Sequence, residues 1–451
     1  AMHSALRVMS EQEAGASRDR RATELGLVLL AVIVAAGGYA LTSLGTQADL
    51  PADLAPFAVI AAGLAVVAHL AVRRLAPRAD GTLLGVAALL NGIGFVVIAR
   101  LDPDLARLQS VWTALSVGAF VAVLVLVRRV RDLERYRYTF ALVGIAALVM
   151  PVLPGVGREI NGARLWVSLG PLNFQPGEAA KVLLVVFLAA YLVEKRELLS
   201  VGTKRLGPLV LPDPKHLGPL LLAWGFSILV MVQEKDLGSS LLFFAVFLAM
   251  VYMATGRASY LGVGAVMFAA GAAFAYATFS HVQDRVTTWL DPWPVSEGRG
   301  FQLVQALFAF GSGGFAGTGL GLGSPGKIPN APTDFVFAAI GEELGLLGTT
   351  AVLALYILLV AVGFRVALAA EQPFLKLLAA GLTTILGVQT FIILGGVTRL
   401  IPLTGITLPF VSYGGSSLLA NFVILALLLR VSDEVARRAE APAGSDAGAV
   451  R

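Results

Sequence analysis

The chain has 451 residues, of which 57% are hydrophobic and 14% charged, with a formal net charge of +5. Since soluble globular proteins carry about 25% charged residues, this composition excludes a soluble protein, and the lack of cysteine excludes disulfides, thiolate metal ligands and thiol nucleophiles. The mean hydropathy of +0.81 is typical of helices packed in lipid.

A helix needs about 20 apolar residues to cross the hydrocarbon core of a bilayer. Runs of about this length, bounded by charges, glycine or proline, predict an all-α polytopic membrane protein with about 12 transmembrane helices. In chain order the runs are Leu25 to Leu44, Phe57 to Leu75, Thr82 to Ala99, Val111 to Val127, Tyr138 to Leu153, Ala179 to Val193, Leu217 to Val232, Leu237 to Thr255, Tyr260 to Phe279, Phe335 to Phe364, Leu375 to Gly396, and Phe410 to Leu429.

The distribution of Lys and Arg predicts the orientation. An even number of spans puts both termini on one side, and most of the 34 Lys and Arg residues fall in the segments on that side. Because cytoplasmic segments are enriched in Lys and Arg, both termini are predicted to be cytoplasmic. No polybasic run is long enough to suggest nucleic acid as a partner.

The predicted division of the chain follows from these runs. It comprises a cytoplasmic tail (1–23), two extra N-terminal transmembrane helices (24–78), a core (79–430) with a large extracellular loop (280–334), and a disordered cytoplasmic tail (431–451). A second outside segment, from Pro154 to Gln175, is also too long for a simple turn, and loops of such lengths are usually functional.

An ionisable pair begins the sixth span, in the sequence QPGEAAKVLL. Glu178 and Lys181 share a helix face because they are three residues apart, and Pro176 suits a first helical turn. Two interpretations stay open: a structural ion pair that seals the helix start, or a polar pair that faces a substrate. Neither interpretation allows the pair to face lipid.

Asp334 lies where the large outside loop meets the tenth span, in PNAPTDFVFAAIGEELG. The simplest role for such an aspartate is to cap the helix, although Thr333 could do so instead. Glu342 and Glu343 follow two turns later, and three carboxylates in one half of a span suggest a water-filled cavity. An acid at the rim of that cavity is a candidate general base.

Other motifs fall on the same side. Asp236, in QEKDLGSS, suits either a capped turn or the candidate cavity. The glycine-rich stretch from Gly311 to Gly326 lacks the strand and GK[ST] ending of a P-loop, which leaves a backbone nest for an anion or close packing.

The stretch LIPLTGITLPFVSYGGSS, which holds Ser412 and Ser416, breaks a helix near its membrane end. Broken backbone at that depth must line a cavity or be buried in protein. The four histidines are scattered, so no built-in zinc site is predicted.

Together these motifs resemble the SEDS family, the group of RodA, FtsW and SpoVE, from about Thr82 to Arg430. The resemblance rests on LPFVSYGGSS after IPLTGIT, on NGARLWVSLGPLNFQPGEAAK, on TDFVFAAIGEELG, and on GFQLVQALFAFGSGGFAGTGLGLG preceded by a tryptophan-rich motif. The residues that carry the tryptophan-rich motif and the GFQLVQ stretch are Arg285, Trp289, Asp291, Pro292, Trp293, Gln302 and Gln305. Two positions depart from the family pattern: Gly177 replaces a serine and Leu165 an arginine. The two extra spans resemble those of actinobacterial RodA-type members.

The resemblance implies a glycosyltransferase that polymerises lipid II into peptidoglycan strands on the outer face of the bacterial cytoplasmic membrane. It implies a class B penicillin-binding protein as partner in cell elongation, with membrane lipid around the chain. By motif match, Asp334 is the family's essential aspartate, and Glu178 with Lys181 its conserved polar pair. The candidate substrate-binding residues are Asn161, Arg164, Trp166, Glu178, Lys181, Asp236, Arg285, Gln302, Gln305, Glu342, Glu343, Ser412 and Ser416.

This chemistry needs one base, because a donor bond that is alpha and a product that is beta require a single inverting displacement. Asp334 is the predicted base. Arg164, Lys181, Arg285 or a divalent cation such as Mg or Mn would stabilise the pyrophosphate leaving group, with no cofactor built in.

Two alternatives come from other functional classes. A lipid II flippase would use the same charges, but alternating access should place polar residues along the whole path, whereas the motifs lie mostly on the outer side. A scaffold that only recruits the crosslinking enzyme leaves an acid-lined cavity unexplained.

Overall fold

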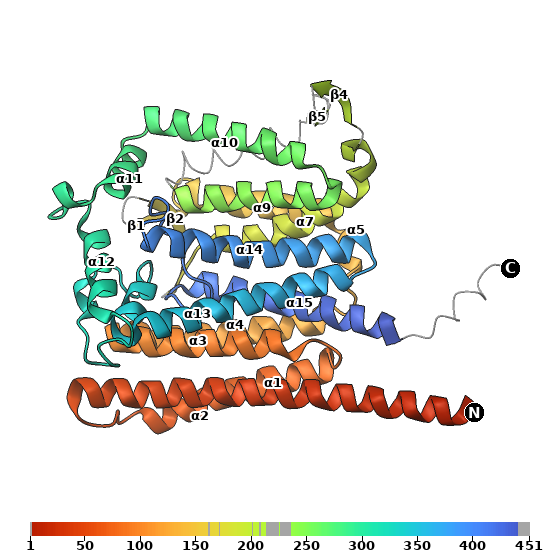
Figure 1. Ribbon diagram of the computed structural model, residues 1–451, viewed down its shortest axis with the longest axis horizontal. Coiled ribbons are helices and arrows are strands. Elements are labelled where there is room, and N and C mark those ends of the chain that lie inside the picture. The colour runs from red at the N-terminus through yellow and green to blue at the C-terminus, as the bar shows by residue number, and fades with distance from the viewer. Residues whose placement is uncertain are drawn as a thin grey trace.

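The computed structural model describes residues 2–160, 163–170, 172–200, 202–206, 209–212, 225 and 236–440, and within them the chain is a bundle of long helices (Figure 1). Ten of the described helices are long and apolar enough to cross a membrane. They are α1 (Met2–Gln47, apolar from Ala22), α2 (Leu54–Leu75), α3 (Gly81–Leu101), α4 (Pro103–Leu126), α7 (Pro176–Ser200), α9 (Leu237–Thr255), α10 (Ala258–Thr278), α13 (Val336–Ala369), α14 (Pro373–Val397) and α15 (Gly415–Glu440).

These helices confirm most of the predicted spans. The run from Tyr138 to Leu153 forms a shorter helix, α6 (Arg137–Val149), extended by the 3-10 turn η1 (Met150–Val152). The run from Leu217 to Val232 lies outside the described residues, so the count of twelve stays a prediction, as does the cytoplasmic placement of the termini. The start of α1 and the end of α15 lie at the same end of the bundle (Figure 1). We call the opposite end, which carries α11 and α12, the site end.

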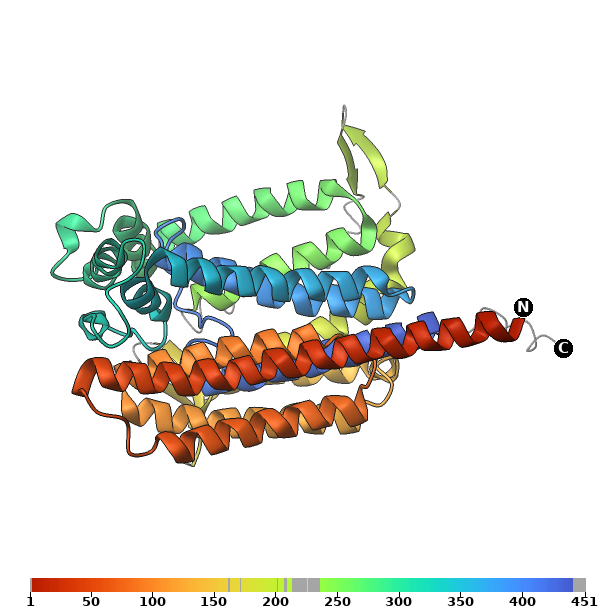
Figure 2. The ribbon, with the colours of Figure 1, turned by 60° about the horizontal axis from the view of Figure 1, so that its bottom comes forward.

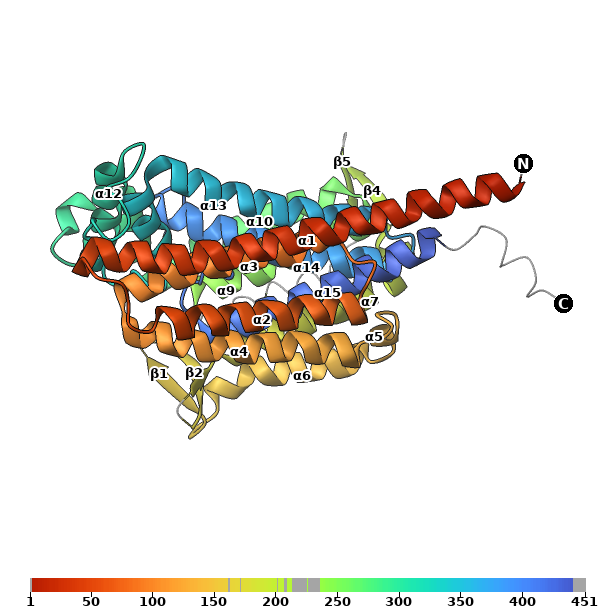
Figure 3. The same cartoon turned by 90° about the horizontal axis from the view of Figure 1, so that it is seen from below.

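The interior of the bundle is built around α14 and α15. Almost all residues along the apolar part of α15 are buried, whereas few of those on α2 and α10 are. Helix α15 packs on α4, α14 packs on α13, α9 and α7, and α6 packs on α7. The N-terminal hairpin adds a layer in which α1 covers α3 and α2 lies beside α4 (Figure 3). Helices suit this setting because each satisfies its own backbone hydrogen bonds within lipid.

Local sequence explains several helix ends. Asp102 caps α4 by accepting from the N–H groups of Asp104 at 2.9 Å and Leu105 at 3.1 Å, with Pro103 in the first turn. Gly256 ends α9 with φ of 68°, a left-handed conformation that glycine adopts without strain. These signals set where the chain turns back into the membrane.

The two long segments at the site end are folded, which hydropathy did not predict. The first forms an antiparallel sheet in the order β1 (Gly157–Ile160), β2 (Ala163–Leu169) and β3 (Leu172–Phe174), with Gly157 opposite Val167 and Val167 opposite Phe174. The second forms α11 (Ser280–Leu290), η3 (Trp293–Val295), α12 (Phe301–Gly313) and η4 (Pro325–Lys327), gathered beyond the ends of α10 and α13 (Figure 2). The remaining elements are α5 (Asp132–Arg135), β4 (Gly202–Leu206) and β5 (Leu209–Pro212).

The prediction of disorder after Arg430 was wrong for residues 431–440. Helix α15 continues to Glu440, because Arg430 donates to the carbonyls of Leu75 and Leu124 and the Asp433 carboxylate accepts from the Arg78 N–H at 2.9 Å. The polar composition of this stretch reflects contacts with the ends of neighbouring helices, which a local reading of hydropathy does not detect. Residues 441–451 lie outside the described residues.

Candidate active site

Asp334 lies at the site end, in the turn just before α13. Its N–H donates to the carbonyl of Asn330 at 3.1 Å, and Phe335, which has no capping side chain, occupies the cap position of the helix. The carboxylate therefore does not cap α13, the simplest role for such a residue. It is free to act in the space between α11 and the segment that follows α14.

Arg285 of α11 faces the same space. Its Nη1 donates to the carbonyl of Leu403 at 2.6 Å, which anchors the guanidinium. A Cβ atom built on Gly405 would lie 3.8 Å from both Nη atoms of Arg285 and 3.8 Å from Oδ2 of Asp334, so both charged groups approach this one glycine. Gly405 has φ of 79°, a conformation for which glycine is suited.

A second carboxylate, Asp236, lies close enough to interact electrostatically with both groups. Asp236 precedes α9 and caps it by accepting from the N–H of Ser239 at 3.0 Å and its hydroxyl at 2.6 Å. Gly238 packs against Thr404 and Ile406, which brings the start of α9 to the same segment as Gly405. Asp236 therefore caps α9, as expected, and also lies near the candidate base.

Burial raises the pKa of the Asp334 carboxyl to about 6, against the opposing effects of the Arg285 guanidinium and a hydrogen bond from Thr333, while Asp236 raises it further. Burial also raises the pKa of Asp236. A carboxyl with a pKa near 6 is largely ionised at neutral pH, yet is a stronger base than an ordinary aspartate, which suits general base catalysis.

Glu178 and Lys181 form a buried pair in the first turns of α7. Lys181 Nζ lies 2.5 Å from Glu178 Oε2 and donates to Gln389 Oε1 of α14 at 2.8 Å, and the Lys181 side chain is only 3% exposed. The amide of Gln389 donates in turn to the carbonyl of Thr407 at 2.8 Å. Gln389 was not among the residues predicted from the sequence, although an isolated amide in an apolar run is a signal that could have identified it.

Residues 398–414, which we call the crossover segment, connect this pair with Asp334. The Thr407 hydroxyl donates to Ser417 at 2.8 Å, the Ser412 hydroxyl donates to the carbonyl of Thr333, and the Tyr413 N–H donates to the carbonyl of Pro332 at 2.8 Å. Ser416, which follows the segment, accepts from the N–H of Gln175 at 2.8 Å. Ser412 and Ser416 thus hold backbone in place, and the broken helix predicted here is buried in protein.

Glu342 and Glu343 hold the glycine-rich segment. Glu342 Oε1 accepts from the Ser324 N–H at 2.7 Å, and Glu343 Oε1 lies 3.1 Å from Nε of Arg100. Their backbone carbonyls accept from the N–H groups of Thr318 at 2.9 Å and Gly319 at 3.0 Å. The glycines therefore serve close packing on α13, one of the two roles considered for them, and these two acids are engaged away from Asp334.

Gly317 provides a test of this packing. A Cβ there would lie 2.2 Å from the Glu343 carbonyl oxygen, and its φ is 84°, so we expect Gly317→Ala to destabilise the protein by about 2–4 kcal/mol. Thermal melting in detergent measures this loss. Gly311→Ala is the matched control, since nothing lies within 4 Å of a Cβ at that position, and equal melting of the two variants would contradict the packing role.

The other predicted site residues lie further along the site-end elements. Arg164 Nε donates to the Gly157 carbonyl at 3.4 Å and Trp166 is opposite Arg158, so both belong to the sheet. Gln302 and Gln305 are half-buried on α12, where Gln305 lines a cavity of about 420 Å³. Asn161 lies outside the described residues.

Comparison with known proteins places this site in a family. Residues 82–437 match the FtsW, RodA and SpoVE family, described as "Cell cycle protein". The chain belongs to this family. The match includes all the described residues around Asp334, Arg285, Glu178 and the crossover segment, and it leaves out α1 and α2.

Individual relatives extend the match. The chain is 47% identical to "Peptidoglycan glycosyltransferase RodA" of Mycobacterium tuberculosis, over 92% of this chain and 90% of that protein. It is 46% identical to the protein of the same name from Mycobacterium leprae, again over 92% and 90%. Identity to "Probable peptidoglycan glycosyltransferase FtsW" of Geobacter metallireducens is 32%, over 79% of this chain and 95% of that protein. A match over 92% of the chain must include part of the N-terminal hairpin, so the chain is of the actinobacterial RodA type.

Solved structures of related proteins also match the fold of the chain. A chain of a peptidoglycan synthase complex, studied for the coordination of polymerization and crosslinking, superposes with a TM-score of 0.64 at 30% identity, over 79% of this chain and 98% of that chain. "Rod shape determining protein RodA" of Thermus thermophilus superposes with a TM-score of 0.54 at 28% identity, over 78% and 96%. With its ten described apolar helices, the chain is a multi-pass protein of the bacterial cytoplasmic membrane.

Proposed function

We propose that this protein is a peptidoglycan glycosyltransferase that polymerises lipid II on the outer face of the membrane, with Asp334 as general base. The observation that carries the proposal is the convergence of Asp334, whose pKa is about 6, and Arg285 on Gly405, at the end of the bundle away from the termini. The names of relatives 47% identical over most of the chain support the same activity.

The proposed step is a single displacement. The 4-hydroxyl oxygen of the acceptor sugar attacks C1 of the donor, its proton passes to Asp334, and the bond from C1 to the lipid pyrophosphate breaks with inversion at C1. Arg285 stabilises the negative charge that develops on the leaving group. Among the side-chain cations first considered, Lys181 is engaged by Glu178 and Gln389 and Arg164 belongs to the sheet, which leaves Arg285 as the cation beside the base.

The test is polymerisation of labelled lipid II by the purified protein in liposomes, alone and with its cognate class B penicillin-binding protein. We propose that this transpeptidase is the partner during cell elongation, and the similarity to a chain of a peptidoglycan synthase complex supports it. Glycan strands from wild type support the enzyme. Movement of lipid II across the bilayer without any strand formation would instead support the flippase.

Arg285→Gln should move the kinetic pKa. Because the Arg285 guanidinium lowers the pKa of Asp334, its removal should raise the apparent pKa of kcat/KM above about 6 and lower the rate at neutral pH. The pH profile of polymerisation measures both effects. Arg158→Gln, on the exposed sheet, is the matched control, and an unchanged profile for Arg285→Gln would contradict its place beside the base.

The divalent cation considered from the sequence remains a proposal. Among the described residues no three His, Cys, Asp or Glu side chains cluster as a metal site would require. We therefore propose that a Mg²⁺ or Mn²⁺ ion would be held mainly by the pyrophosphate oxygens of the substrate, the kind of ligand that such ions prefer, and would offset the charge of the leaving group. EDTA should then lower the polymerisation rate reversibly, without changing the melting temperature of the substrate-free protein. Unchanged polymerisation in EDTA would contradict the ion.

A further inference from the structure

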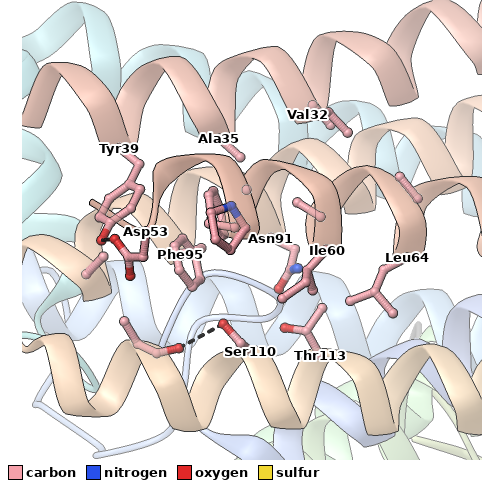
Figure 4. A pocket seen from close by; sticks show the side chains of 18 of the residues that line it. Val32, Ala35, Tyr39, Asp53, Ile60, Leu64, Asn91, Phe95, Ser110 and Thr113 are labelled. Atoms are coloured by element: carbon pink, nitrogen blue, oxygen red, sulfur yellow. Dashed lines mark hydrogen bonds between the residues drawn. The ribbon is translucent and has the colours of Figure 1, made fainter. Parts of the chain in front are cut away.

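The N-terminal hairpin encloses a cavity that the proposed reaction does not use. It measures about 840 Å³ and lies between α1, α2, α3 and α4, with Phe422 of α15 at its base. Figure 4 shows side chains of all four helices around it, among them Val32, Leu64, Phe95 and Thr113. It is separate from Asp334 and Arg285, neither of which lines it.

The lining changes from apolar to polar along the cavity. Toward the end nearer the termini it is lined by Val28, Leu64, Leu84 and Val117, with no charged side chain among them. Toward the site end, the lining residues include Tyr39 and Asp53, joined by a 2.8 Å hydrogen bond, together with two arginines. This gradient matches an amphiphile whose tail points into the bilayer and whose head lies at the membrane surface.

Two buried polar atoms in the lining have no hydrogen-bond partner. They are Oδ1 of Asn91, which Figure 4 shows beside the cavity, and Oγ1 of Thr42, whose residue is only 4% exposed. Buried polar atoms without partners are costly, and both residues belong to the lining of the cavity.

Charged side chains of both signs line the mouth, namely Asp53, Arg100 and Arg107. Arg100 is already bonded to Glu343 and to the Gly323 carbonyl. Arg107, in contrast, is 81% exposed, and its one ion pair among the described residues is with the similarly exposed Asp104 at 3.2 Å, a contact of little energetic value. Arg107 is therefore the cation available to a phosphate group at the membrane surface.

The volume of the cavity indicates what kind of molecule it can hold. At about 30 Å³ per carbon, close to the volume of a water molecule, the cavity holds roughly 28 tail carbons. About 28 carbons is of the order of the acyl chains of one phospholipid.

We propose that this cavity binds one anionic phospholipid, with its acyl chains between the hairpin and the core and its phosphate at Arg107. The lipid completes the interface between α1, α2 and the rest of the bundle, where the side chains leave space. The hairpin, which lies outside the family match, thereby forms a lipid site together with α3 and α4.

The experiment measures binding to the full-length protein directly, so it does not depend on the proposed activity. Delipidated protein in detergent is titrated with phosphatidylglycerol, phosphatidylcholine or polyprenyl phosphate, and bound lipid is counted by native mass spectrometry. We expect one phosphatidylglycerol per chain, with roughly tenfold weaker binding of it to Arg107→Gln than to wild type. Ala65→Phe, which fills the apolar part, should abolish binding.

Matched controls separate the site from the general surface. Lys327→Gln removes an exposed charge at the site end, and Ala270→Phe adds a ring on the exposed face of α10, so neither should change binding. Because Ala65→Phe could disturb folding, a photoreactive benzoyl-phenylalanine at Ile60 provides a second measurement, crosslinking to phosphatidylglycerol in otherwise unaltered protein. The proposal fails if wild type binds no phospholipid, if Ala65→Phe binds as wild type does, or if polyprenyl phosphate is preferred.

Discussion

Replacing Asp334 with Asn or Ala should lower the polymerisation rate by about 10²- to 10⁴-fold, the range that loss of a general base produces. The expectation follows from the position of the carboxylate beside Arg285 and outside any capping role for α13. Production of labelled glycan strands per minute at saturating lipid II is the measurement. Asp104→Asn removes an exposed carboxylate at the same end of the bundle and should retain activity.

The pH dependence gives an independent test of the same residue. Since the pKa of Asp334 is raised to about 6 and the ionised form is the base, kcat/KM should rise between about pH 5 and 7 and level off above. A rate that stays flat across this range would move the base to another group.

Stability should change in the opposite direction from activity. A folded pKa of about 6 lies above the ordinary value of 3.8, so the folded state binds the proton more tightly and the contribution of Asp334 to stability falls as pH rises from about 4 to 6. Above that range the buried charge is a net cost. Asp334→Asn should therefore melt at the same temperature as wild type or higher at pH 7.5, which separates loss of catalysis from misfolding.

Lys181→Met should cost about 3–5 kcal/mol of stability, because it leaves Glu178 buried without its cation and Gln389 without its donor. Thermal melting in detergent, together with retention of a single species on gel filtration, measures the effect. Lys195→Met breaks a half-exposed pair with Glu194 on the same helix and should cost less than about 1 kcal/mol.

The double variant Glu178→Gln with Lys181→Met distinguishes the two interpretations of the pair. Removing both charges avoids the unpaired buried ion, so melting should recover most of the loss if the pair is structural. If polymerisation recovers with it, the pair acts by positioning the crossover segment through Gln389 and Thr407. Restored melting with activity still lost would instead identify a pair that contacts substrate.

The sequence by itself determined the helices and the main charged groups of the site. Bilayer thickness imposes a length on each apolar run whatever its neighbours are, so the ten described spans and α6 follow from hydropathy. Asp334 and Lys181 were identifiable because ionisable residues are rare in or beside spans, and Arg285 was identifiable from the motif that resembles the family. Their motifs also matched the family that the comparisons show.

The tertiary structure decided which of these groups meet. Asp334 and Arg285 converge only because the crossover segment folds back against both. Glu342 and Glu343 do not join them, because their carboxylates are bonded to the glycine-rich segment and to Arg100. Gln389, residues 431–440 of α15 and the cavity under the N-terminal hairpin each depend on partners far along the chain. Hydropathy is a local property, whereas hydrogen-bond partners and packing volume are set by contacts between distant segments, and those contacts are what the fold supplies.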